Sequence, residues 1–380
     1  GGQIMPPVMG AAAFLIAEYL GIPYAEVALA ALVPAVLYYI TLFIQVDLLA
    51  ARNGIQGLAR SELPRLGPVM LRSAGFVVPL AVLIGAMFFM NRRAEEAGLW
   101  ATLSAFFIGF LTPSTRIGLR GLFNVMISMG RGMLEIAAIT GLAGVVIGVL
   151  HLTGLGSTLT LTLLNVGQSS AILLLILTAV VSIILGMGMP TTAVYVLLAV
   201  LVAPGLSKLG ILPIAAHLFI FYFGMLSMVT PPVCLASYAA ASIGKTDPIK
   251  TGWEAMRLCA IAYVIPFLFV FSPSLLLIGT WYAVALSITT AIFGAVLLGI
   301  GLVGYLFSPV GALKRLLFVV AAAGLLIPVV ETGSYANLTW AVNAGGLLLA
   351  LIMVAIEWLA RSRRQDSKIA EATKASVSGL

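Results

Sequence analysis

Two short stretches carry the residue types that could bind a small solute or an ion within an otherwise apolar chain. Ser182–Tyr195 reads S-I-I-L-G-M-G-M-P-T-T-A-V-Y, and Leu226–Val233 reads L-S-M-V-T-P-P-V. Glycine and proline interrupt helices, and an interruption leaves backbone groups free to act as ligands beside the threonine hydroxyls. We therefore expect both stretches to be binding elements rather than parts of continuous helices.

The chemistry of these stretches has to rely on neutral groups, because no Asp, Glu, Lys or Arg occurs from Ile136 to Ser207. The helices that start near Thr191-Thr192 and after Pro231-Pro232 would point free N–H groups and their positive dipole ends at mid-membrane. This arrangement favours an anion as the solute.

The helix ends that precede the same breaks would turn carbonyl oxygens toward the same region, which suits a small hard cation such as Na⁺. Each threonine has the alternative role of capping or bonding back to its own helix. The predicted Na⁺ ligands are Gly186, Met187, Gly188, Thr192, Ser227, Val229 and Thr230. H⁺ is the alternative coupling ion, and His217 is the titratable residue that it would use; a packed, neutral His217 is the other interpretation.

The elements that position these residues belong to a membrane protein. The chain has 380 residues, 62% of them hydrophobic and 9% charged, and its mean hydropathy is +1.16. This composition indicates an all-α polytopic membrane protein. The basic residues lie in loops, so the net charge of +7 is no sign of nucleic-acid binding. The motifs H-E-x-x-H and G-x-S-x-G are absent, so we expect no enzyme activity, no catalytic residue and no cofactor.

The apolar runs on both sides of each break are too short to cross a bilayer comfortably. The pattern predicts a re-entrant helical hairpin at about 169–205 and a broken helix at about 214–243. Full spans are expected at Tyr24–Ala50, Pro68–Met90, Leu99–Leu111, Leu134–Leu150 and Ala255–Leu277, and later at Trp281–Phe307, Leu316–Val330 and Leu338–Leu359. Gly118–Met133 reads as an amphipathic interfacial helix.

An internal repeat relates the two ends of this region. Pro6-Pro7-Val8 and Pro23 correspond to Pro231-Pro232-Val233 and Pro248 at the same spacing, which favours an inverted-repeat secondary transporter. The predicted division is 1–50 (end of a first repeat), 51–278 (second repeat), 279–360 (three-span extension) and 361–380 (disordered cytoplasmic tail). Alternate threading places all of the 20 basic residues except Arg92, Arg93 and Lys208 on one face, which should be cytoplasmic.

Three motifs give the chain a resemblance to a known family. They are G-M-G-M-P-T-T-A-V-Y at 186–195, A-A-H-L-F-I-F-Y-F-G-M-L-S-M-V-T-P-P-V at 215–233 and G-G-Q-I-M-P-P-V-M-G at 1–10. Over roughly residues 1–278 the chain resembles the large permease of tripartite ATP-independent periplasmic (TRAP) transporters, in particular the type served by TAXI-family binding proteins. The first hairpin of that permease is missing here, so the sequence looks like its C-terminal part.

The resemblance implies an elevator-type secondary transporter of the bacterial inner membrane. It would import organic anions such as carboxylates with a Na⁺ gradient, together with a periplasmic TAXI-type binding protein and a small membrane subunit or a fused N-terminal equivalent. The implied substrate-binding residues are Gly186, Gly188, Pro190, Thr191, Thr192, Thr230, Pro231, Pro232, Gln3, Pro6 and Pro7. A non-transporting membrane scaffold is the alternative, and it predicts unbroken helices at Gly186–Thr192 and Thr230–Pro232. A channel is a further alternative, which the repeat and the hairpin disfavour.

Overall fold

The computed structural model describes residues 1–59, 61–90, 92–111, 118–154, 158, 170–329 and 336–378, and these residues form helices and no strand. The chain divides into two compact units. Unit 1 consists of Gly1–Leu32 and Leu58–Gly252, and unit 2 consists of Val33–Gly57 and Trp253–Leu380. The chain passes between the units three times. The crossings after Leu32 and Gly252 fall inside helices, α2 (Tyr24–Arg52) and α12 (Pro248–Leu258), and the third follows Gly57.

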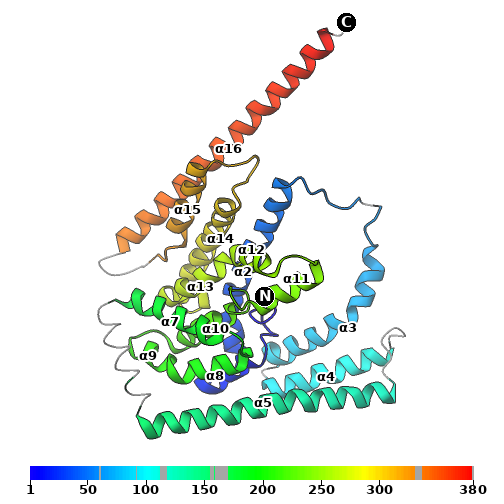
Figure 1. The fold of residues 1–380 in the computed structure, drawn as a ribbon, viewed down its shortest axis with the longest axis vertical. Helices are drawn as coiled ribbons and strands as arrows, with labels where there is room; N and C mark the ends of the chain where they lie inside the picture. Colours follow the sequence, from blue (N-terminus) through cyan, green and yellow to red (C-terminus); the bar gives the residue numbers. More distant parts are fainter. Residues whose placement is uncertain are drawn as a thin grey trace. The chain divides into compact units, whose positions relative to one another are not determined.

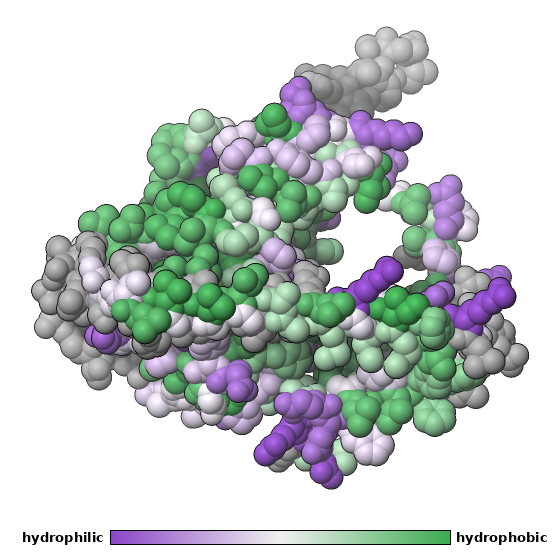
Figure 2. Space-filling model, turned by 60° about the horizontal axis from the view of Figure 1, so that its bottom comes forward, coloured by the Kyte–Doolittle hydropathy of each residue, from purple (hydrophilic) through white to green (hydrophobic). Residues whose placement is uncertain are grey.

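Four helical stretches in the described part of the chain are long and apolar enough to cross a membrane. They are Tyr24–Arg52, Pro248–Phe271, Trp281–Val303 and Asn337–Arg361. Large apolar side chains are also exposed, among them Phe76 (81%) and Trp281 (82%). Figure 2 shows hydrophobic residues covering much of one face of the molecule, with hydrophilic residues gathered in separate groups. A surface of this kind suits lipid rather than water, and the predicted class, an all-α polytopic membrane protein, is confirmed.

Unit 1 is organised around α10 (Pro213–Leu226), which is buried along almost its whole length. Four helices pack against it, and they lie around it in Figure 1: α1 (Ala11–Leu20), α7 (Ala171–Gly186), α8 (Thr191–Leu201) and α9 (Ala203–Lys208). The remaining elements of the unit are α3 (Leu66–Ile84), the π-helix η1 (Gly85–Phe89), α4 (Ala94–Leu111), α5 (Leu119–Thr153) and α11 (Leu235–Gly244). The helix α5 packs against α8, and α3 packs against α4.

Unit 2 contains the C-terminal part of α2, most of α12, α13 (Ala260–Phe271), the 3₁₀ turn η3 (Pro273–Leu276), α14 (Trp281–Val303), α15 (Ala312–Leu326) and α16 (Ala336–Ser378). One hydrophobic core joins α2, α14, α15 and α16. It includes Leu48 of α2, Ile300 of α14, Phe318 of α15 and Met353 of α16.

The two Pro-Pro segments of the predicted repeat have similar local structure. Each has a cis Pro–Pro bond and precedes a helix of 10 residues, α1 or α11. Each helix then ends at a residue in the left-handed conformation, Gly21 (φ 63°) or Lys245 (φ 50°). The repeat and its inversion across the membrane stay predictions.

Three predicted elements were wrong, and a fourth has different bounds. Gly118–Met133 and Leu134–Leu150 are not an interfacial helix and a separate span, because α5 runs unbroken through both; its glycines are tolerated and it contains no proline. The span predicted at Ala255–Leu277 is present with shifted bounds: the apolar helical stretch runs over Pro248–Phe271, with an interruption at Cys259, and ends before Pro273. The tail after Arg361 is helical to Ser378 rather than disordered, since it contains good helix formers and neither glycine nor proline before residue 379.

Candidate functional site

The break after α7 forms where the sequence predicts it. The helix ends at Gly186, Gly188 takes a left-handed conformation (φ 79°), and Pro190 stands at the N-cap of α8. Glycine adopts such a backbone without strain, and proline has no N–H with which to continue the preceding helix. The chain therefore stops one helix and starts another within five residues, and Thr191 and Thr192 become the first residues of α8.

The second break, Ser227–Cys234, separates α10 from α11 and touches the first break directly. The Ser227 hydroxyl lies 2.7 Å from the Gly224 carbonyl oxygen and 2.9 Å from the Gly186 carbonyl oxygen. It donates one hydrogen, which these two acceptors share. A Cβ atom on Gly186 would lie 2.5 Å from the Gly224 carbonyl oxygen, so the end of α7 rests on the backbone of α10.

Tyrosine hydroxyls fix both Pro-Pro loops. Tyr24 donates a short hydrogen bond to the Pro7 carbonyl, and Tyr238 donates one to the Pro232 carbonyl. The Thr230 hydroxyl is buried and donates to the Leu226 carbonyl at 2.6 Å, so it bonds back to its own helix. This is the alternative role that the sequence left open for the threonines.

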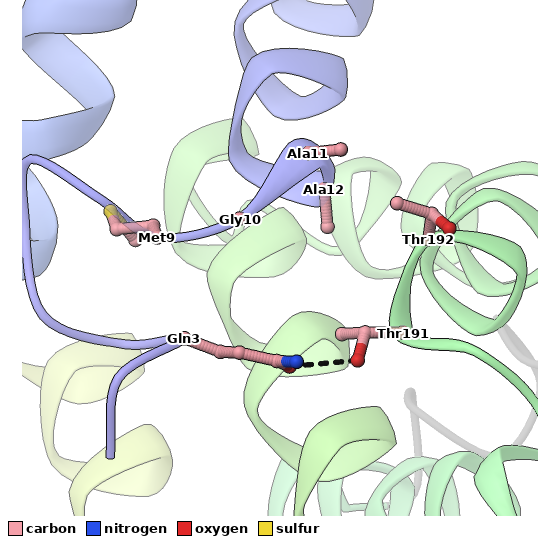
Figure 3. Close-up of a pocket in the computed structure, with 7 residues that line it drawn as sticks. All are labelled: Gln3, Met9, Gly10, Ala11, Ala12, Thr191 and Thr192. Carbon is pink, nitrogen blue, oxygen red and sulfur yellow. Dashed lines mark hydrogen bonds between the residues drawn. The ribbon is translucent and has the colours of Figure 1, made fainter. Parts of the chain in front are cut away.

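A cavity of about 160 Å³ opens where the N-terminal loop meets the start of α8 (Figure 3). The Thr191 hydroxyl donates to the Gln3 side-chain oxygen across 2.7 Å, which joins residues 188 positions apart in the chain. Gly10 stands at the N-cap of α1 with φ 79°, a conformation that favours glycine. The lining residues are Gln3, Met9, Gly10, Ala11, Ala12, Thr191 and Thr192.

Two helix N-termini meet at this cavity. Ala11 and Ala12 are the first residues of α1, and Thr191 and Thr192 are the first of α8. The first N–H groups of a helix have no partner within it, and neither N-cap residue, Gly10 or Pro190, supplies a side-chain cap. The lining residues carry no formal charge, so the positive ends of the two helix dipoles are the main electrostatic attraction that the lining offers to an anion.

The predicted residues therefore fall into three groups. Gln3, Thr191 and Thr192 line the cavity. Gly186 and Ser227 meet at the contact between the two breaks, where the Ser227 hydroxyl donates to the Gly186 carbonyl. The others lie in the two breaks or the N-terminal loop and do not line the cavity: Pro6, Pro7, Met187, Gly188, Pro190, Val229, Thr230, Pro231 and Pro232.

The sequence reasoning missed the apolar part of the lining, namely Met9, Gly10, Ala11 and Ala12. Gly10 was the available signal, because a glycine between an irregular segment and an apolar run often marks a helix end. In the described residues, no three His, Cys, Asp or Glu side chains lie close enough to share a metal ion.

His217 lies on α10, which packs against α1 and α8, the two helices whose first residues line the cavity. Its Nδ1 atom is 2.7 Å from the Tyr195 hydroxyl, and the Tyr19 ring lies 6.2 Å away. Both His217 (8% exposed) and Tyr195 (1%) are buried. The pair ties α8 to α10, and this supports the packed interpretation of His217.

These features define a class of protein: a polytopic helical membrane protein whose interrupted helices surround a small uncharged cavity. Membrane transporters build binding sites in this way. A family model described as the tripartite ATP-independent periplasmic transporter, DctM component, matches residues 1–286. The chain belongs to this family, which is one of transporters and not of enzymes. A search of curated proteins found no match.

Proposed function

We propose that the chain is a permease that crosses the bacterial inner membrane several times. It moves an organic anion, such as a carboxylate, across that membrane. The observation that carries this proposal is the cavity between the N-termini of α1 and α8. Each helix N-terminus acts as roughly half a positive charge, so two of them suit a carboxylate without an ionic partner. Hydroxyls of Thr191 and Thr192 and the Gln3 amide add hydrogen-bonding groups.

The driving ion in this proposal is Na⁺. The carbonyl groups of Met187, Gly188 and Val229 lie in the two breaks and accept no backbone hydrogen bond from the described residues. Neutral oxygens of this kind can replace the hydration shell of Na⁺, and they have no useful proton affinity. The Ser227 hydroxyl donates a hydrogen bond to the Gly186 carbonyl, so these two groups would join such a site only after rearrangement.

The family name describes a tripartite transporter, and we infer the matching partners for this chain. They are a periplasmic binding protein, of the TAXI type by the motifs at 1–10, 186–195 and 215–233, and a small membrane subunit or its fused equivalent. Interrupted helices built from repeats suit an elevator-type movement of the site. The alternative of a non-transporting scaffold predicts continuous helices, and both predicted breaks are present.

Uptake assays test the proposal. Right-side-out membrane vesicles holding the complete transporter, with its cognate binding protein outside, are supplied with radiolabelled organic acids one at a time, with and without an inward Na⁺ gradient. We expect saturable uptake of at least one acid that depends on the gradient. Absence of uptake for every acid, with the proteins shown to be present and folded, would contradict the proposal.

The cavity itself is tested by Thr191→Val. The valine keeps the shape and removes a hydroxyl from the lining, which should raise the half-saturating substrate concentration about tenfold. Thr289→Val is the matched control, because the Thr289 hydroxyl bonds to the Ala285 carbonyl of α14 in unit 2. An equal effect of both substitutions would show that the cavity does not bind the substrate.

A further inference from the structure

The last three helices lie almost wholly beyond the residues that the family model matches, which end at 286. They are α14, which starts at Trp281, α15 and α16. The family assignment gives no role to residues 287–380. Their packing in unit 2 provides evidence about that role.

Polar contacts at both ends fix α15 against α16. At one end the Lys314 ammonium group lies 2.6 Å from a carboxylate oxygen of Glu357, which is only 2% exposed. At the other end the Asn343 amide donates to the Ile327 carbonyl at 2.7 Å. Between them the backbones approach closely, because a Cβ atom on Gly324 would lie 3.0 Å from the Cα atom of Gly346. Polar contacts of this kind specify the register of a helix pair.

Two arginines from different helices hold the C-terminal end of α14. Arg315 of α15 donates to the Gly301 carbonyl at 2.9 Å and to the Leu302 carbonyl at 2.8 Å. Arg52, the last residue of α2, donates to the Val303 carbonyl at 2.7 Å. The last carbonyls of a helix have no partner within it and carry the negative end of the dipole, so cationic donors suit them.

The helices α2 and α14 also touch in the turns before these ends. A Cβ atom on Gly299 would lie 3.3 Å from the side chain of Gln45 and 3.7 Å from that of Ile44. Leu48 of α2 belongs to the same core as Ile300 of α14. Residues after 286 thus contact one face of residues 44–52 of α2, and the hydrogen bond from Arg52 to the Val303 carbonyl fixes the end of this segment.

This covered segment lies after a weak point in α2. Pro34 lies inside the helix, where it removes one backbone hydrogen bond. The chain passes from unit 1 to unit 2 at the adjacent position, between Leu32 and Val33. A helix that changes unit beside a proline needs other contacts to hold its second half in place.

We propose that residues 287–380 act as an intramolecular clamp that immobilises the second half of α2. The clamp consists of the Gly299 contact, the Arg52 bond to α14 and the α15–α16 pair that fixes α14 through Arg315. It does not depend on which solute or ion the protein carries. The proposal assigns residues 287–380 a mechanical role in unit 2 rather than a part in binding.

Hydrogen–deuterium exchange of the full chain in detergent or lipid nanodiscs tests the clamp, with residues 38–48 of α2 as the reporter. Gly299→Leu introduces a side chain where Gln45 and Ile44 lie, and Arg52→Gln removes the cationic donor. We expect exchange in the reporter to become about tenfold faster with Gly299→Leu and about threefold faster with Arg52→Gln, because local opening controls exchange.

Matched controls are Gly345→Leu, where an added side chain meets nothing within 4 Å, and Arg131→Gln on α5. Neither should change exchange in the reporter. If Gly299→Leu does not fold, Arg52→Gln decides the outcome. Unchanged exchange in residues 38–48, with faster exchange in α14 or α15, would overturn the proposal, because the extension would then stabilise only itself.

Discussion

Among the glycines in the described part of unit 1, Gly186 has the least room for a side chain. An added Cβ atom would lie 2.5 Å from the Gly224 carbonyl oxygen and 2.8 Å from the Ser227 hydroxyl oxygen. Both neighbours belong to α10 and its end, and neither is the flexible tip of a long side chain. The identity of this residue is therefore set by packing against backbone.

Gly186→Ala should lower the free energy of unfolding by about 1–3 kcal/mol, the usual cost of overpacking. The measurement is the thermal midpoint of the purified protein in detergent. Gly98→Ala in α4 is the control, since its Cβ atom meets nothing within 4 Å and alanine favours a helix. Equal midpoints for the two variants would contradict the close contact between α7 and α10.

Thr230→Val tests the coupling ion. The Thr230 hydroxyl is buried in the second break and donates to the Leu226 carbonyl. If the oxygen binds Na⁺, its loss should cost about 1–3 kcal/mol and raise the half-activating Na⁺ concentration ten- to a hundredfold. The measurement is uptake by the complete transporter at a series of Na⁺ concentrations.

The contradicting result is uptake that is unchanged without Na⁺ on either side and instead follows a pH gradient. His217 would then be the next residue to replace, because it is the buried titratable histidine of α10 and contacts Tyr195.

At the scale of elements, the loop before α4 and the turn after α2 should face opposite sides of the membrane. A cysteine at Arg93 should react with a membrane-impermeant maleimide in intact cells, and one at Asn53 only after permeabilisation. Both residues are exposed, and the native Cys234 and Cys259 are buried. Labelling of the Asn53 cysteine from outside would reverse the predicted topology.

Helix breaks were predictable from the sequence because their cause is local. Glycine at 188 and proline at 190 and 231–232 act on the backbone where they stand. The continuity of α5 was not predictable from hydropathy, because a change from an amphipathic to an apolar pattern does not by itself end a helix. The division at Cys259 has no glycine or proline beside it, and the sequence gives no local signal for it.

At the scale of the whole molecule, the cavity depended on information that local patterns do not contain. The sequence placed Gln3 and Thr191 in separate motifs, and only the fold shows them in hydrogen-bonding contact. The apolar lining from Met9 to Ala12 follows from how α1 packs against α8 and α10. Residue types indicated the chemistry, and long-range packing determined which residues share the cavity.

The inferred partners lead to a prediction for the assembled transporter. Vesicles that contain all membrane components but no periplasmic binding protein should show no saturable uptake of the transported acid. Adding the purified binding protein, loaded with that acid, should restore it. Equal uptake with and without the binding protein would show that the permease takes solute directly from solution.

The close packing around Gly186 and Ser227 has a consequence for how sequences of this kind can diverge. Position 186 has space only as far as the Gly224 carbonyl and the Ser227 hydroxyl allow, and a Cβ atom at Gly224 would in turn lie 2.7 Å from Val194. A larger residue at one of these positions needs compensating changes at the others. Related chains should therefore vary the residues at 186, 194, 224 and 227 together, as a covarying set that links α7, α8 and α10.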